Sequence, residues 1–149
     1  MKGFTYLELI LVVALTLIIF TMGTSIYGNL LTITQIHDSS KQITYALRLA
    51  QLRSNHRLNN SQHGVYFEIN TPGDDRFILY QGNDYSSRDI SFDQVNTLGP
   101  ALSISTTFTG DEINFTAGTG SPDQTGIITL THSTSGNKNI IVNQLGMVE

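Results

Sequence analysis

Four histidines are the side chains best suited to acid–base chemistry near neutral pH. They are His37, His56, His63 and His132, and none lies in a His-Glu-x-x-His, Gly-x-Ser-x-Gly or phosphate-loop pattern. His56 and His63 flank the predicted end of a helix, where they could share a metal, although surface histidines are the commoner outcome. We therefore predict no catalytic residue, no metal site and no cofactor, and the protein is not expected to be an enzyme.

Acidic side chains gather in the region 74–93, where carboxylate and amide oxygens would suit Ca²⁺. Their spacing lacks the EF-hand pattern. A solvated acidic loop is therefore our prediction, with a calcium site as the alternative. The residues are Asp74, Asp75, Asn83, Asp84, Asp89 and Asp93.

Glu8 is the most unusual ionisable residue, because it stands at the start of an apolar run. Of the 14 residues 9–22, 12 are apolar, and no Asp, Glu, Lys or Arg lies between Glu8 and Asp38. This run predicts a membrane helix, at whose centre a carboxylate costs roughly 2.5–3.5 kcal/mol. Glu8 is then either a functional group with an ionic partner or a side chain that reaches the headgroups.

Helical spacing continues beyond the apolar run, so we expect one helix from about Thr5 to Arg57. No proline interrupts it; Gly23 and Gly28 are its weak points, and Asn-Asn-Ser at 59–61 ends it. Downstream, alternating apolar residues predict short strands joined by turns. These strands are expected at 65–70, 76–81, 102–108, 112–117, 127–132 and 138–143.

The expected fold class is therefore α+β. Its long N-terminal helix is predicted to be transmembrane in the first half and amphipathic in the second, and to pack on an antiparallel β-sheet or a small β-sandwich head. Five phenylalanines at strand spacing are expected in the core of this head. They are Phe67, Phe77, Phe92, Phe108 and Phe115.

Charge and cysteine content exclude several classes of protein. With 8 Lys and Arg against 12 Asp and Glu, the net charge is −4, so no global cationic field attracts nucleic acid. The absence of cysteine excludes thiolate catalysis, Cys-based metal sites and disulfides. The head must be held together by packing and hydrogen bonds.

Residues 2–8 (Lys-Gly-Phe-Thr-Tyr-Leu-Glu) and the apolar run behind them resemble the prepilin signature of the type IV filament superfamily. This superfamily includes type IV pilins and the pseudopilins of type II secretion and competence. Segments 45–54 and 126–146 are similar to GspH/FimT-type minor pseudopilins. The resemblance implies that a prepilin peptidase cleaves after Gly3 and methylates the new N-terminal residue, Phe4. It also implies that Glu8 pairs with the N-terminal amine of a neighbouring subunit.

The resemblance divides the chain into a leader (1–3), a transmembrane and filament-core helix (4–36), an amphipathic helix half (37–60) and a β-rich head (61–149). It implies a structural subunit, a minor pilin or pseudopilin, of a bacterial type IV pilus or type II secretion pseudopilus. The expected location is the inner membrane, as a single-pass protein with a cytoplasmic N-terminus, and then a periplasmic or extracellular filament.

The implied partners are other pilin or pseudopilin subunits, the prepilin peptidase, an inner-membrane assembly platform, and membrane lipid before assembly. DNA is not an expected partner. Relatives credited with DNA uptake carry arginines near the C-terminus, whereas no basic residue follows Lys138 here.

A second class of function stays open. The chain could instead be a membrane-tethered extracytoplasmic module that binds DNA or another ligand, or an enzyme with a simple N-terminal anchor. A pilus, a secretion system and a competence system also stay open, as do minor and major subunits.

Overall fold

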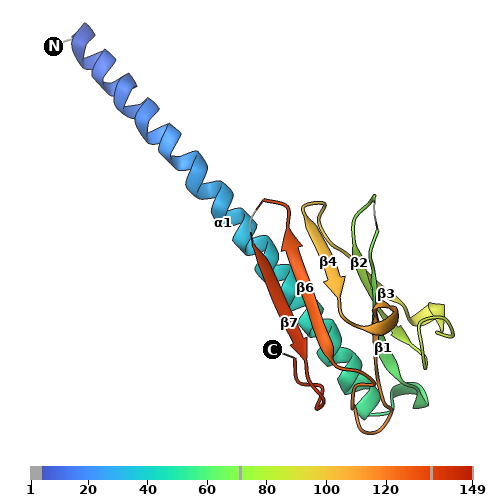
Figure 1. Ribbon diagram of the computed structural model, residues 1–149. Helices are drawn as coiled ribbons and strands as arrows, with labels where there is room; N and C mark the ends of the chain where they lie inside the picture. Colours follow the sequence, from blue (N-terminus) through green and yellow to red (C-terminus); the bar gives the residue numbers. More distant parts are fainter. Residues whose placement is uncertain (1–4, 71, 135, 149) are drawn as a thin grey trace. The chain divides into compact units, whose positions relative to one another are not determined.

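The computed structural model describes residues 5–70, 72–134 and 136–148, apart from the side chains of residues 22–30. The chain divides into two units, Met1–Gln35 and Ile36–Glu149, which we treat separately. The described part begins with a 50-residue helix, α1 (Tyr6–Asn55). The strands are β1 (His63–Glu68), β2 (Arg76–Gln81), β3 (Gln94–Thr97), β4 (Leu102–Thr106), β5 (Glu112–Phe115), β6 (Gly126–His132) and β7 (Asn137–Val142) (Figure 1). Short 3-10 helices are η1 (Leu58–Asn60), η2 (Ile90–Phe92) and η3 (Thr109–Asp111).

The prediction that the first half of this helix is transmembrane is wrong. Over the residues that the structure describes, no helix contains a stretch long and apolar enough to cross a membrane. The physical reason is length: the 14 residues 9–22 rise about 21 Å as a helix, against a hydrocarbon core of about 30 Å. The expected fold class is therefore wrong in its transmembrane helix, and the expected location as a single-pass inner-membrane protein is wrong for the same reason.

Two antiparallel sheets form the strand part of the unit Ile36–Glu149. The first, sheet A, has the order β3-β2-β1-β5, and the second, sheet B, has the order β4-β6-β7. Strands β1 and β2 form the predicted hairpin, in which Val65 pairs with Leu79 and Phe67 with Phe77. Strand β3 was not predicted, because its four side chains are all exposed and leave no apolar alternation in the sequence.

The core of this unit is shared by α1 and both sheets. Ile43, Leu47 and Ala50 of α1 are fully buried in a cluster with residues of sheets A and B, as helical spacing predicts. Four of the five phenylalanines expected in the core are buried there. Phe92 is 45% exposed in η2, so its assignment to the core is wrong.

Two glycines allow segments of the unit Ile36–Glu149 to approach each other closely. A Cβ on Gly64 of β1 would lie 2.5 Å from the Tyr80 ring and 2.7 Å from the Ile113 carbonyl oxygen, so the site admits only glycine. Gly146 adopts a left-handed φ of +72°, and a Cβ there would overlap the Gln51 side chain. Gln51 donates from Nε2 to the carbonyl oxygens of Gly120 (3.1 Å) and Leu145 (3.2 Å), which fixes the C-terminal turn on α1.

Candidate functional site

Glu8 lies in the first turn of α1, where Thr5 caps the helix. The Leu9 amide donates to the Thr5 carbonyl oxygen (3.2 Å), and the Glu8 amide donates to Thr5 Oγ1 (3.3 Å). Thr5 and Glu8 therefore hold the Ncap and N3 positions of the Thr-x-x-Glu capping-box pattern. Sequence reasoning missed this role, although the spacing was visible in residues 5–8.

Gly3 and Phe4, the predicted cleavage and methylation sites, lie outside the residues that the structure describes. Glu8 is described, and its side chain is exposed in the unit Met1–Gln35. Its carboxylate is thus accessible to a partner, and the predicted ion pair with another subunit stays a prediction.

An apolar surface of α1 follows Glu8. The twelve large apolar side chains between Tyr6 and Phe20 are 49–81% exposed. Two threonines, one in this stretch and one just after it, turn their hydroxyls onto their own helix. Thr16 Oγ1 donates to the carbonyl oxygens of Val12 and Val13 (2.9 Å each), and Thr21 Oγ1 donates to that of Ile18 (2.9 Å). Neither threonine therefore interrupts the apolar character of the surface.

The acidic residues of region 74–93 take separate structural roles. Asp75 is buried and joins the sheets, because its Oδ1 accepts from the Asn70 amide (2.8 Å) and its Oδ2 from the Ile104 amide (2.7 Å). Asp93 pairs with Arg88 (2.8 Å). Within the described ranges, no group of three or more His, Cys, Asp or Glu could hold a metal ion.

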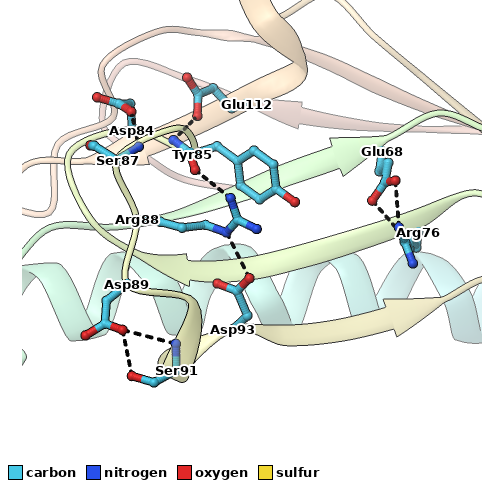
Figure 2. Close-up of polar contacts among 10 residues, drawn as sticks. All are labelled: Glu68, Arg76, Asp84, Tyr85, Ser87, Arg88, Asp89, Ser91, Asp93 and Glu112. Carbon is cyan, nitrogen blue, oxygen red and sulfur yellow. Dashed lines mark hydrogen bonds and ion pairs between the residues drawn. The ribbon is translucent and has the colours of Figure 1, made fainter.

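The loop 82–93 between β2 and β3 folds over sheet A and is held by aromatic and ionic contacts (Figure 2). The Tyr85 ring stacks on Tyr66 with centroids 3.8 Å apart, and the Arg88 guanidinium lies 3.7 Å from the Tyr85 ring centroid. Arg88 also donates to the Tyr85 carbonyl oxygen (2.8 Å), while Glu112 Oε2 accepts from the Tyr85 amide (2.8 Å). These contacts give the loop a defined conformation.

Hydrogen bonds keep the exposed carboxyls of this region ionised. The hydroxyl and amide of nearby serines lower the pKa of Asp84 and of Asp89 below the usual aspartate range. The Arg76 guanidinium, 2.6 Å from Glu68, lowers the pKa of Glu68 through a hydrogen bond and its charge. Burial, and then the adjacent Glu112 carboxylate, raises the pKa of the Tyr80 hydroxyl.

The four histidines lie at separate places in the unit Ile36–Glu149. His63 is buried, and its amide donates to Ser54 Oγ (2.8 Å), so this Ser–His contact is made through the histidine backbone. Burial, and then the charge of Arg53, lowers the pKa of the His63 imidazole. The Thr134 amide donates to His132 Nδ1 (3.2 Å), Lys138 Nζ lies 3.2 Å from His37 Nδ1, and His56 is exposed.

Cations gather where α1 and β7 line a common cleft. Lys41 and Arg48 of α1 and Lys138 of β7 line a cleft of about 250 Å³ between the helix and this strand. No sequence motif marks this site, since Lys138 lies about a hundred positions from the helical cations. Only the folding of β7 next to α1 brings Lys138 close to Lys41 and Arg48.

The chain matches no protein-family model, no curated protein and no solved structure. The resemblance to type IV pilins and pseudopilins therefore depends on the sequence features themselves, chiefly residues 2–8 and the apolar run behind them.

Proposed function

We propose that this protein is a structural subunit of a filament of the type IV pilin and pseudopilin kind, assembled through α1. The observation that carries the proposal is the exposed apolar surface of residues 6–20, in which Glu8 is the one charged residue. Exposed apolar patches of this extent mark interaction sites. Parallel copies of the same helix offer a matching apolar surface to cover it.

Processing would supply the ionic partner of Glu8. Cleavage after Gly3 creates a positively charged amine on Phe4, four residues before Glu8. In staggered helices, the amine of one subunit meets the Glu8 carboxylate of the next. A slipped register would leave a buried charge unpaired, so the ion pair selects the register of assembly.

The processing step is tested by the mass of the chain from cells with and without a prepilin peptidase. We expect a chain that lacks residues 1–3 and carries one added methyl group when the peptidase is present. A chain that still begins at Met1 in both strains would contradict the proposal.

The assembly step is tested by Glu8→Gln, with Thr5→Ala as its matched control. Glutamine can retain the N3 role in the capping box, while the carboxylate charge is lost. We expect Glu8→Gln to abolish incorporation into filaments. Thr5→Ala removes the cap, at a cost of about 0.5–2 kcal/mol to the helix, but should leave incorporation in place. Equal losses in both variants would assign Glu8 to capping and contradict the proposed ion pair.

A further inference from the structure

The unit Ile36–Glu149 distributes its charges unevenly. Residues 36–55 of α1 together with β7 contain four cations and one carboxylate: Lys41, Arg48, Arg53, Lys138 and Asp38. In the part of the chain that the structure describes, the two ion pairs lie elsewhere, at Arg76–Glu68 and Arg88–Asp93. The surface formed by α1 and β7 is therefore cationic, although the chain has a net charge of −4.

The cations of this surface converge on the cleft of about 250 Å³ between α1 and β7. Three cations and three hydroxyl-bearing side chains line it: Lys41, Arg48, Lys138, Ser40, Thr44 and Tyr45. Among the described residues, Arg48 donates to the Val148 carbonyl oxygen (3.2 Å), and Lys138 Nζ lies 3.2 Å from His37 Nδ1. These contacts orient the two side chains at the cleft, and the three cations suit it to an anionic group.

A complementary acidic surface lies on loop 82–93. Asp84 Oδ1 accepts from Ser86 Oγ (2.6 Å) and the Ser87 amide (2.7 Å), and Asp89 Oδ1 accepts from the amide (3.0 Å) and hydroxyl (2.6 Å) of Ser91. Each carboxylate thus uses one oxygen for its own turn (Figure 2). The contacts of Tyr85 and Arg88 hold the loop in place, which reduces the entropy lost when it binds.

The two charged surfaces are separated within one unit. Figure 1 shows β7 and the loop that follows β2 on different sides of the head. A contact between the cleft of one copy and the loop of another would use two different patches. Contacts of this heterologous kind leave one free patch at each end, so they can propagate into an open helical assembly.

We propose that the cleft between α1 and β7 binds the Asp84–Asp89 loop of a second copy of this chain. The contact extends the proposed function and rests on it. It adds an interface between the units Ile36–Glu149 of two copies to the interface made by the helices. Charge complementarity identifies the occupant: the loop presents two carboxylates, and the cleft presents three cations. Opposed surfaces of this kind contribute more to specificity and to the association rate than to raw affinity.

The chain contains no cysteine, so single cysteines can report proximity between copies. Asn83→Cys places a thiol on the loop, and Asn139→Cys places one at the cleft; both positions are exposed. Full-length chains carrying one substitution each are mixed under mild oxidant, with one of them labelled with ¹⁵N. We expect the mixed disulfide to form faster than either homodisulfide and to slow as salt is added. A Ser105→Cys chain, exposed on β4, should not pair with Asn139→Cys.

Charge variants of the same two chains test the chemistry of the contact. Asp84→Asn with Asp89→Asn keeps the acceptor oxygens of the turns but removes both charges, and should slow the mixed disulfide by at least roughly tenfold. Asp84→Lys with Asp89→Lys should stop it against the unmodified cleft. A partner carrying Lys41→Glu, Arg48→Glu and Lys138→Glu should restore it. The Asp74→Lys variant is the matched control and should change nothing.

Three outcomes would overturn the contact. The first is that no mixed disulfide forms. The second is that the rate of the mixed disulfide is the same in all charge variants. The third is that the cleft binds nucleic acid in preference to a second copy. Failure of the proposed function is distinguishable. If Glu8→Gln chains join filaments normally while the charge swap restores the disulfide, the ion pair fails and the head contact stands. If Glu8→Gln chains fail to join filaments and the charge swap does not restore the disulfide, the head contact alone is rejected.

Discussion

The two units use the same helical period in different surroundings. In Met1–Gln35, large apolar side chains such as Leu15 and Ile19 are 50% and 68% exposed, whereas in Ile36–Glu149 Ile43 and Leu47 are fully buried. A helix face becomes part of a core only where another element covers it. The apolar residues of the second unit form an interior, whereas those of the first are exposed and, in our proposal, act as an interface.

The two units also differ in what stabilises their helical residues. Isolated helices gain little from propensity, and most helical stability in proteins comes from packing of an apolar face. Residues 36–55 obtain this packing from two sheets of their own chain. In the filament proposal, the apolar stretch after Glu8 obtains this packing from other copies of the helix.

The largest expected effect separates the two units directly. Leu47→Ala should lower the free energy of unfolding by about 2–5 kcal/mol, because it leaves a cavity in a closed core. Leu15→Ala, at a position 50% exposed, should change the free energy of unfolding by less than about 0.5 kcal/mol but weaken assembly. Urea denaturation and filament incorporation measure the two effects. Similar losses of stability in both variants would break the distinction between interface and interior.

A smaller effect is expected at the link between the sheets. Asp75→Ala leaves the Asn70 and Ile104 amides without their acceptor, which should cost about 1–3 kcal/mol in the free energy of unfolding. Asp74→Ala, at the exposed neighbouring position, is the control and should be near neutral. An unchanged urea midpoint for Asp75→Ala would show that the head does not depend on this link.

The smallest effect depends on pH and belongs to the head alone. Because the pKa of buried His63 is lowered in the folded state, the unfolded state binds a proton more readily. The contribution is fully present above the ordinary histidine value of about 6.5 and is lost as the pH falls through that value toward the folded pKa. The free energy of unfolding, measured by urea denaturation over this window, should therefore decrease as the pH falls.

The control for this prediction is His56→Gln, at an exposed position, which should keep the decrease. His63→Gln should flatten it. A slope that persists in His63→Gln would assign the pH dependence to other groups.

Local patterns predicted much of the secondary structure. The helix expected from about Thr5 to Arg57 is observed as Tyr6–Asn55, and the strand expected at 76–81 is observed as Arg76–Gln81. Both depend on short-range periodicity, which the sequence contains. Strand β3 was not predicted, because it has no apolar alternation of its own. Its pairing with β2 makes it a strand.

The candidate sites divide in the same way. Glu8 is conspicuous in the sequence because a carboxylate among apolar residues needs a partner, although its place in the capping box was overlooked. The membrane assignment failed because apolar character was weighed without the length of the run. The cleft of Lys41, Arg48 and Lys138 was invisible, since no local rule links β7 to α1.

By itself, the sequence determined which residues form the long helix and most of the strands, the absence of cysteine chemistry and the isolation of Glu8. Tertiary structure alone decided which apolar residues are covered, how Asp75 joins the sheets, and which charges line one cleft. The physical reason is range. Helical and strand periods act over a few residues, whereas burial and charge pairing depend on segments that meet only after the chain has folded.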